Sequence, residues 1–326
     1  MRSRGDDALR FYNRKFDGCE TAELRVSEEE VEAAYREVGE YFLQTLAEAA
    51  ANIREFHERQ RREGFSYTRP DGTRLGQRIM PLARVGVYVP GGTAAYPSTV
   101  LMDVIPAVVA GVGEIAMVTP PGKDGKIKAE ILAAAKIAGA NEIYRVGGAQ
   151  AIAALAYGTG SIRRVDKIVG PGNAFVAAAK KAVSGEVGID MFAGPSEILI
   201  IADGTANPDH LAADMLSQAE HDKMASAVLV TTSAIVAERT AELIEKRLAD
   251  LPRQETARAS IENNGKIIVA SSLVEAAEIS YELAPEHLEI VTLDPESVLD
   301  IVKNAGSVFL GDYSPEPVGD YFAGPN

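Results

Sequence analysis

The amino-acid sequence predicts an α/β protein built from two blocks, each with a parallel-rich sheet and helices on both faces. From residue 82 onward, short apolar runs alternate with alanine-rich helical stretches, as parallel strands joined by helices do. The alternation pauses near residues 190–200 and then resumes, which divides the pattern into two similar blocks. The chain has 326 residues, enough to bury a core in both.

The region before the first block predicts helices. Residues 27–62 keep a helical period of apolar side chains, and Ser27 followed by Glu30 has the spacing of a capping box. Gly39 indicates a bend within this region. Its charged tail, HERQRREG, is expected in solvent, and with it the side chain of His57.

The first block holds four strand–helix repeats. In chain order they are VGVYV and STVLMDVIPAVVAG, EIAMVTP and KAEILAAAKIAG, EIYRVG and AQAIAALAYG, and KIVG and NAFVAAAKKAV. Gly- and Pro-rich turns lie at residues 90–93, 147–150 and 170–173, and a fourth at 194–197 leads into the second block. Such turns are expected at the carboxyl edge of a parallel sheet, where doubly wound folds bind ligands.

These turns have two interpretations. Glycine lets the backbone approach a ligand, and a helix start behind it favours phosphate. However, any tight strand-to-helix connection needs glycine, and no turn matches a Walker loop or the full G-x-G-x-x-G fingerprint. Nucleotide binding and simple chain connection therefore both stay open.

The second block continues the alternation. Its segments are the strand EILIIAD, the helix in DHLAADMLSQAEHD, the strand SAVLVTT, the helix AERTAELIEKRLAD, the strand GKIIVA, the helix SSLVEAAEISYEL, the strand HLEIVT, the helix PESVLDIVKNA and the strand SVFLG. With the first block they are expected to form two incomplete Rossmann-like domains, preceded by the N-terminal helices. His210, in the first turn of its helix, is expected to be exposed.

The helix within residues 209–222 carries apolar and polar residues on one face. Leu211, Met215, Gln218 and His221 follow one another at helical spacing, so the apolar stripe leads into a Gln–His pair. The pair could hold a ligand at the floor of a cleft, or could merely cap the helix end. A neutral glutamine oxygen is an unusual zinc ligand, so the spacing alone does not decide between a ligand-binding pair and a helix cap.

Three further residues are candidates for chemistry. Glu286 and His287 lie immediately before an apolar strand, and a carboxylate beside an imidazole that titrates near neutrality suits acid/base catalysis. Loop carboxylates and imidazoles also occur without such a role. Asp320 lies in the Gly/Pro loop PEPVGDY, and with Gln218 and His221 it would offer a metal one nitrogen and two oxygens.

Charge and cysteine content exclude several classes of function. The formal net charge of −14 argues against nucleic acid or an anionic membrane as the main partner. Cys19 is the only cysteine, which excludes an intrachain disulfide and a Cys-built zinc site and suits a reducing cytoplasm. The first residues lack a signal-peptide core, and no apolar run reaches membrane-spanning length. A soluble, cytoplasmic protein is expected.

Eight segments together resemble the histidinol dehydrogenase family. They are VGVYVPGGTAAYPSTVLM, RVGGAQAIAALAYGT, VDKIVGPGNAFV, IDMFAGPSEILIIAD, LSQAEHD, APEHLE, AGSVFLGDYSPEPVGDY and the terminal AGPN. They occur in the family's order and span nearly the whole chain from Arg84 onward. The N-terminal RGDDALRFYNRKFDG also fits.

The resemblance implies an enzyme that converts L-histidinol to L-histidine through L-histidinal in two NAD-dependent oxidations, with one Zn²⁺ per subunit. Gln218, His221 and Asp320 match three of the family's zinc ligands. Glu286 and His287 match its acid/base pair. In these implied roles His287 takes the alcohol proton, and Glu286 activates the water that hydrates the aldehyde.

The resemblance also implies where the cofactor and the substrate bind. Tyr88, Gln150 and Asn173 match positions that hold NAD. Ser196 matches a position that contacts the substrate, together with the zinc-ligand and acid/base residues.

A domain arrangement and a homodimer follow from the same resemblance. Residues 1–88 with 203–326 are expected to form the first α/β domain, with the zinc and acid/base residues, and 89–202 the second, with the NAD-binding loops. The family motif continues past the position of Asn326 with a substrate-contacting histidine and a helical segment that carries a fourth zinc ligand and reaches the partner subunit. The resemblance therefore implies that this chain, which also begins abruptly, lacks part of the completed active site and holds zinc weakly, so both an active and an inactive form stay open.

Two other functions stay open on the sequence. One is another zinc- and NAD-dependent alcohol dehydrogenase of the same superfamily, acting for example on a sulfonated diol. The other is a remnant that binds NAD or metal without catalysis. Formation of two NADH per histidinol would separate the histidinol dehydrogenase from both.

Overall fold

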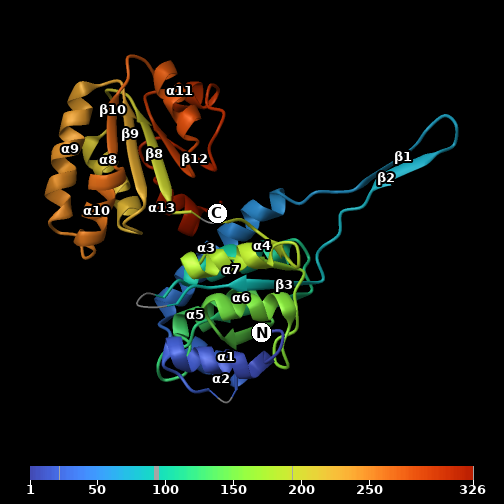
Figure 1. Cartoon of the computed structure of the whole chain (residues 1–326). Coiled ribbons are helices and arrows are strands. Elements are labelled where there is room, and N and C mark those ends of the chain that lie inside the picture. Colours follow the sequence, from blue (N-terminus) through green and yellow to red (C-terminus); the bar gives the residue numbers. More distant parts are fainter. Residues whose placement is uncertain (22, 92–94, 193, 326) are drawn as a thin grey trace. The chain divides into compact units, whose positions relative to one another are not determined.

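The computed structural model describes residues 1–326 except 22, 92–94, 193 and 326, and its contacts divide the chain into two compact units (Figure 1). Unit 1 comprises Met1–Ala193 with Tyr321–Gly324, and unit 2 comprises Gly194–Asp320 with Pro325–Asn326. Each unit contains one five-stranded sheet, and every described strand pair in both sheets is parallel. The predicted α/β class with two parallel-rich sheets is therefore confirmed, and so is the junction near residues 190–200.

The sheet of unit 1 has the strand order β5-β4-β3-β6-β7. Its strands are β3 (Arg84–Tyr88), β4 (Glu114–Thr119), β5 (Glu142–Arg145), β6 (Lys167–Val169) and β7 (Gly188–Ile189). Counted along the chain within this sheet, the order is 3-2-1-4-5, which is the Rossmann order for its first five strands. The order reverses between β3 and β6, so the switch point at which such sheets bind ligands lies there.

Helices cover both faces of this sheet. One face packs against α2 (Glu28–Glu37), α3 (Glu40–Arg59), α4 (Pro97–Val109) and α5 (Ala129–Ala138), and the other against α1 (Gly5–Tyr12), the π-helical turn η1 (Asn13–Asp17), α6 (Gly148–Tyr157) and α7 (Ala174–Val183). Successive strand residues point to opposite faces. Val87 therefore lies in the core under α4 and α5, and Tyr88 lies in the core under α6.

The N-terminal helical region divides at Gly39, where a bend was predicted. The hydroxyl of Ser27 accepts from the N–H of Glu30, whose carboxylate accepts from the N–H of Ser27, so the predicted capping box is present. Gly39 is the N-cap of α3. The expectation that His57 is a surface residue was wrong: it is only 9% exposed, because the helix turns its ring inward, where Nδ1 lies 2.7 Å from Gln60 Oε1.

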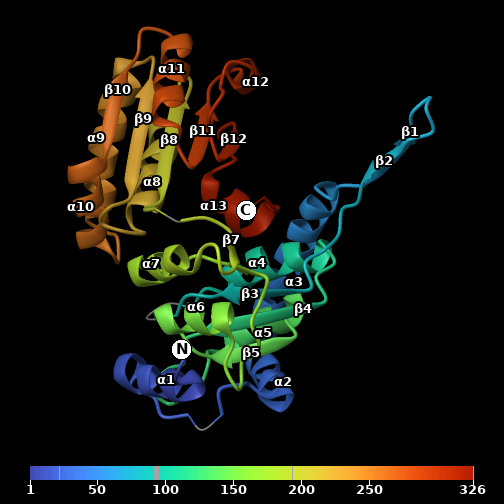
Figure 2. The ribbon, with the colours of Figure 1, turned by 45° about the vertical axis from the view of Figure 1, so that its right-hand side comes forward.

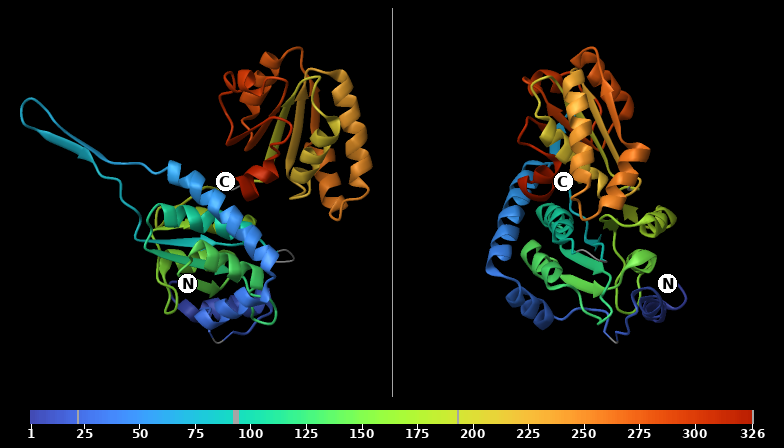
Figure 3. Two further views of the ribbon diagram at one scale, coloured as in Figure 1. Left: turned by 180° about the vertical axis from the view of Figure 1, so that it is seen from behind. Right: turned by 90° about the vertical axis from the view of Figure 1, so that its left-hand side faces the viewer.

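An antiparallel hairpin that the sequence pattern did not predict joins α3 to β3. Its strands are β1 (Phe65–Thr68) and β2 (Arg74–Gln77). The hairpin extends away from the sheet of unit 1 (Figures 1 and 3), and all four residues of β1 are exposed. Alternation between buried and exposed side chains is absent from it, which is why periodicity gave no signal.

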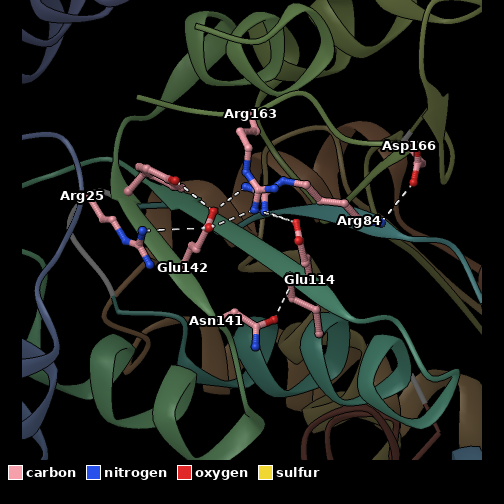
Figure 4. A network of polar contacts seen from close by, with 9 residues as sticks. Arg25, Arg84, Glu114, Asn141, Glu142, Arg163 and Asp166 are labelled. Atoms are coloured by element: carbon pink, nitrogen blue, oxygen red, sulfur yellow. Dashed lines mark hydrogen bonds and ion pairs between the residues drawn. The ribbon is translucent and has the colours of Figure 1, made fainter. Parts of the chain in front are cut away.

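An ion-pair network joins the amino ends of three neighbouring strands in unit 1 (Figure 4). Arg84, at the start of β3, bonds to Glu114 of β4 at 2.8 Å and to Glu142 of β5. Arg163 reaches Glu114 at 2.7 Å, and Asp166 accepts from the backbone N–H of Arg84 at 3.0 Å. Since this network occupies the amino edge of the sheet, the carboxyl edge is the one available to a ligand.

The sheet of unit 2 repeats the same order, as β10-β9-β8-β11-β12 (Figure 2). Its strands are β8 (Glu197–Ala202), β9 (Ser226–Thr231), β10 (Lys266–Val269), β11 (His287–Val291) and β12 (Ser307–Leu310). One face packs against α8 (Pro208–Ala219), α9 (Ala234–Leu248) and α10 (Gln254–Asn264), and the other against α11 (Leu273–Leu283) and α12 (Pro295–Leu299). The chain then forms α13 (Glu316–Val318) and the π-helical turn η2 (Gly319–Ala323).

Two details of unit 2 differ from expectation. The helix α10 was not predicted, because few of its residues are apolar and only Ala257 and Ser260 are buried. His210 is half-buried and not exposed, because its ring lies against that of Tyr313, with the ring centroids 6.1 Å apart. Within the described residues, no helix combines the length and apolar character needed to cross a membrane.

The contacts group the chain differently from the predicted domains. Residues 1–88 were expected with 203–326, yet they lie in unit 1 with residues up to 193. The physical reason is strand pairing and helix packing: β3 pairs with β4 and β6, while α2 and α3 pack on α5 and α4.

Candidate active site

A large cleft opens at the carboxyl edge of the unit 1 sheet. Its volume is about 1560 Å³, and its walls include the turns that follow β3, β4, β5 and β6. Tyr88, Gln150 and Asn173, the three residues matched to NAD binding, all line it. The structure thus brings them together from the end of β3, the first turn of α6 and the N-cap of α7, beside the switch point where doubly wound sheets bind nucleotides.

The polar atoms of these residues are already oriented by the fold. The hydroxyl of Tyr88 accepts from the backbone N–H of Gly148 at 3.0 Å, which leaves its own proton for another acceptor. Burial raises the pKa of Tyr88, so the hydroxyl stays protonated. Asn173 is the N-cap of α7, where Oδ1 accepts from the N–H groups of Phe175 and Val176 and the amide NH₂ remains for a ligand.

Glycine at the predicted turns allows them to pack closely. A Cβ added to Gly147 would lie 2.4 Å from Pro120, so this turn touches the one that follows β4. The cleft is large enough for a dinucleotide, and its wall includes Gly91, Gly122 and Gly148, where the backbone can approach a phosphate. These features fit NAD.

A second polar cluster, within unit 2, is centred on His287. This first residue of β11 is 8% exposed, and its ring has an oxygen acceptor at each nitrogen. Nδ1 lies 3.1 Å from Oε1 of Gln218, and Nε2 lies 3.3 Å from Oδ2 of Asp320. Burial lowers the pKa of His287, but the hydrogen bond and charge of Asp320 outweigh it, so the pKa is raised.

The remaining predicted residues of unit 2 lie around this cluster. His221 follows the end of α8, and its N–H donates to the carbonyl of Gln218 at 3.2 Å. Much of His221 is solvent-exposed, yet desolvation still lowers its pKa, which favours the neutral imidazole that binds metals. Glu286 is exposed, and its Oε2 accepts from the N–H of Glu197 at 3.2 Å, directly after Ser196.

This cluster lies at the amino edge of its sheet, whereas the glycine-rich turns were expected at the carboxyl edge. For the turn at 194–197 that expectation was wrong, because the turn precedes β8. His287 also begins its strand, and α8 runs antiparallel to β8, so Gln218 at its end returns to the same edge. Pro90 and Gly91 after β3, and the turns after β5 and β6, do lie at the carboxyl edge, in unit 1, whereas residues 92 and 93 lie outside the described part of the chain.

Three acidic residues that the sequence analysis missed interact with one another, and one of them, Glu316, lies beside His287. Burial, then neighbouring carboxylates, raise the pKa of Glu289 to about 9 and of Glu316 to about 7; burial raises that of Asp214 to about 6. Glu289 also accepts from the N–H of Glu316 at 2.8 Å. A sequence signal existed: Asp214 lies four residues before Gln218 on a helix, and Glu289 two after His287 on a strand.

The cluster has a donor set suited to a metal ion. Atoms of His287, Glu316 and Asp320 all lie within 4.8 Å of one another. Glu316 Oε2 is buried and has no hydrogen-bond partner among the described residues, so a lone pair remains for a cation. This set shares Asp320 with the predicted ligands but contains His287 and Glu316 in place of Gln218 and His221.

The two sheets and these two sites define an α/β protein of the Rossmann type, with a dinucleotide-sized cleft in one unit and a metal-suited acid/base cluster in the other. A sequence model of histidinol dehydrogenase matches residues 1–326. The chain belongs to the histidinol dehydrogenase family.

Relatives and a solved structure agree with this assignment. The histidinol dehydrogenase of Bacillus licheniformis is 57% identical over 326 residues, which cover 100% of this chain and 76% of that protein. That of Bacillus subtilis is 56% identical with the same coverage. The crystal structure of histidinol dehydrogenase from Elizabethkingia anophelis matches with a TM-score of 0.95 and 41% identity, over 98% of this chain and 74% of that one.

Proposed function

We propose that this chain oxidises L-histidinol to L-histidine in two successive steps, each of which transfers a hydride to NAD. Family membership makes the chain an oxidoreductase of histidine biosynthesis, and the family is in general NAD-dependent and zinc-binding. One observation supports the assignment of the catalytic roles to His287 and Glu286. The buried imidazole of His287 lies between an amide and a carboxylate, with Glu286 next to it in the chain.

His287 and Glu286 supply the proton transfers that the reaction requires. In the first step His287 takes the hydroxyl proton of the alcohol while the carbinol hydrogen leaves as hydride to NAD, which yields the aldehyde. Glu286 then takes a proton from the water that adds to the aldehyde. His287 returns its proton to the oxygen of this adduct, which completes the hydrate. In the second step His287 takes a hydroxyl proton of the hydrate as the second hydride leaves to NAD, which yields the carboxylic acid, and that acid then loses its proton to give the carboxylate.

Gln218, His221 and Asp320 are the residues that we expect to hold zinc. When bound, zinc would act as a template that orients the amine and imidazole of histidinol. Rigid orientation of a substrate can supply roughly 7–11 kcal/mol of the barrier. Two observations support a metal in this cluster: Oε2 of Glu316 has no hydrogen-bond partner within the described part of the chain, and the pKa of His221 is lowered.

Tyr88, Gln150 and Asn173 are the residues that we expect to hold NAD in the cleft of unit 1. The support is their common position on its wall and the orientation of Tyr88 and Asn173 by backbone hydrogen bonds. Ser196 is assigned to the substrate, because the residue after it holds the carboxylate of Glu286.

The other functions that the sequence left open are not favoured. The relatives at 56–57% identity are named histidinol dehydrogenase, which speaks against an oxidoreductase for a sulfonated diol. The polar cluster of unit 2 keeps both members of the acid/base pair, which speaks against a non-catalytic remnant.

Two histidine variants test the assignment of roles. His287→Asn should abolish NADH formation from L-histidinol while zinc content stays at one per chain. His221→Asn should lose zinc together with activity. His57→Asn is the matched control, because this histidine lies on α3 in unit 1. Zinc is measured by elemental analysis and turnover by NADH absorbance.

The alternative set of metal ligands, in which His287 binds the ion, predicts the opposite result for the two variants. If His287 is a ligand with Glu316 and Asp320, then His287→Asn loses zinc and His221→Asn keeps it. That pattern would overturn the proposed division of labour. Formation of two NADH per histidinol by the unsubstituted chain tests the reaction itself.

We also propose that the protein is a homodimer in the cytoplasm. Its support is the family resemblance and the single cysteine, Cys19, which suits a reducing compartment. Light scattering at micromolar concentration measures the oligomeric state, and a monomeric mass would contradict it.

A further inference from the structure

The turn at residues 170–173, which carries Asn173 into the cleft, is held from outside the cleft by an ion pair. We propose that Lys180 and Asp190 are positioning residues that fix this turn for NAD binding. The inference rests on the proposed assignment of the unit 1 cleft to NAD. Neither residue has been assigned a role by the sequence motifs.

The ion pair holds both backbone polar groups of a single residue, Gly170. Oδ2 of Asp190 accepts from the N–H of Gly170 at 2.8 Å. The Nζ of Lys180 donates to the carbonyl oxygen of Gly170 and, at 2.7 Å, to Oδ1 of Asp190. The peptide groups on both sides of Gly170 are therefore fixed by one pair of opposite charges.

Gly170 is also the point where this turn touches Tyr88, a residue that lines the cleft. Its φ is +106°, and a Cβ at this position would lie 2.1 Å from the carbonyl oxygen of Tyr88. Asn173 follows three residues later as the N-cap of α7. A shift of Gly170 would thus move one assigned NAD residue, Asn173, relative to another, Tyr88.

The pair lies behind the cleft wall and does not form part of it. Neither residue is among those that line the cleft in the described part of the chain, and Lys180 is only 4% exposed. A buried ammonium is tolerated only when it is paired and hydrogen-bonded. Asp190 is itself anchored, because its N–H donates to Ile168 of β6 at 3.2 Å.

A third ionisable group, Asp103 of α4, interacts electrostatically with both members of the pair. Burial, and then the charge of Asp190, raise the pKa of Asp103 to about 8, so this carboxyl is mainly neutral at pH 7. The three side chains then carry one positive and one negative charge, and Asp190 is the charged partner of Lys180 among the described residues.

Lys180→Met and Asp190→Asn test the inference. Each removes the ion pair while keeping a side chain of similar size. We expect the KM for NAD to rise at least about tenfold and kcat to change less than twofold, because loss of uniform binding raises KM alone. The KM for L-histidinol should stay unchanged. The affinity for NAD is measured directly by calorimetry.

Glu142→Gln is the matched control. Glu142 pairs with Arg84 in the same sheet but at the opposite edge, so the variant breaks a partly buried ion pair away from the cleft. It should lower the melting temperature without raising the KM for NAD. If Lys180→Met fails to fold, Asp190→Asn decides, because it removes the charge that pairs with Lys180 while keeping the volume of the side chain.

The outcomes separate this inference from the proposed function. Variants of Tyr88 and Asn173 report on the cleft: if Asn173→Ala and Tyr88→Phe leave NAD binding unchanged, the cleft assignment fails and the positioning role falls with it. If those variants weaken binding but Lys180→Met and Asp190→Asn bind NAD as the unsubstituted chain does, the positioning role alone is overturned. The positioning role would also be overturned if Lys180→Met and Asp190→Asn raised the KM for NAD no more than the control Glu142→Gln does.

Discussion

Replacement of Gly170 by alanine tests the close approach that shapes the unit 1 cleft. The added Cβ would lie 2.1 Å from the carbonyl oxygen of Tyr88, and that atom belongs to a buried strand that has no room to move. Gly185 provides the control, because its φ of +96° is similar to the +106° of Gly170 but a Cβ there meets nothing within 4 Å. The two variants therefore share the backbone strain and differ in the clash.

The size of the effect follows from the geometry. Carbon–oxygen contacts of about 3.3 Å are ordinary, so the turn must move by on the order of 1 Å. A misplacement of this size can cost about 100-fold in rate. The shared backbone strain costs roughly 1–3 kcal/mol of stability in each variant. We expect kcat/KM for NAD to fall about 100-fold in Gly170→Ala and less than threefold in Gly185→Ala.

The assay is NADH formation at varied NAD and saturating L-histidinol, with thermal unfolding measured in parallel. Both variants should show lowered melting temperatures, while only Gly170→Ala should lose affinity for NAD. Equal losses of kcat/KM in the two variants would refute the reasoning, because the effect would then come from backbone strain and not from contact with Tyr88.

Three further predictions concern capping, pH and metal. Asn173→Ala removes the side-chain cap of α7, so the free energy of unfolding should fall by about 1 kcal/mol and the KM for NAD should rise; denaturant unfolding and kinetics measure the two. The folded-state pKa of Asp103 is raised to about 8 from an ordinary 3.8. The contribution of its protonated carboxyl to the free energy of unfolding is therefore fully present below pH 3.8 and is lost as pH rises toward 8. Asp103→Asn should therefore gain stability relative to the unsubstituted chain as pH rises from about 5 to about 8, by at most about 4 kcal/mol. If the difference in free energy of unfolding between the two proteins is the same at both pH values, the prediction is wrong. Dialysis against a chelator should abolish turnover and leave NAD binding by calorimetry intact, whereas loss of both would contradict the assignment of zinc and NAD to separate sets of residues.

Much of the local structure could be predicted from residue patterns. Apolar runs and helical periods identified the strands from β3 to β12 except β7, whose two residues, Gly188 and Ile189, are too few to show a pattern. The capping box at Ser27 and the division at Gly39 were local signals of backbone hydrogen bonding, and both are present. The hairpin β1–β2 and the helix α10 were missed, because neither buries a regular apolar stripe.

The sequence by itself determined which side chains are candidates for the chemistry: an imidazole beside a carboxylate, a Gln–His pair at a helix end, and glycines after strands. Only the tertiary structure decided where they meet. His287 contacts Gln218 and Asp320 because α8 returns to the amino edge at which β11 begins, and Lys180 reaches Gly170 because α7 folds back over β6. Strand order and the direction of the returning helices join residues far apart in the chain, and no local pattern of side chains encodes such pairings.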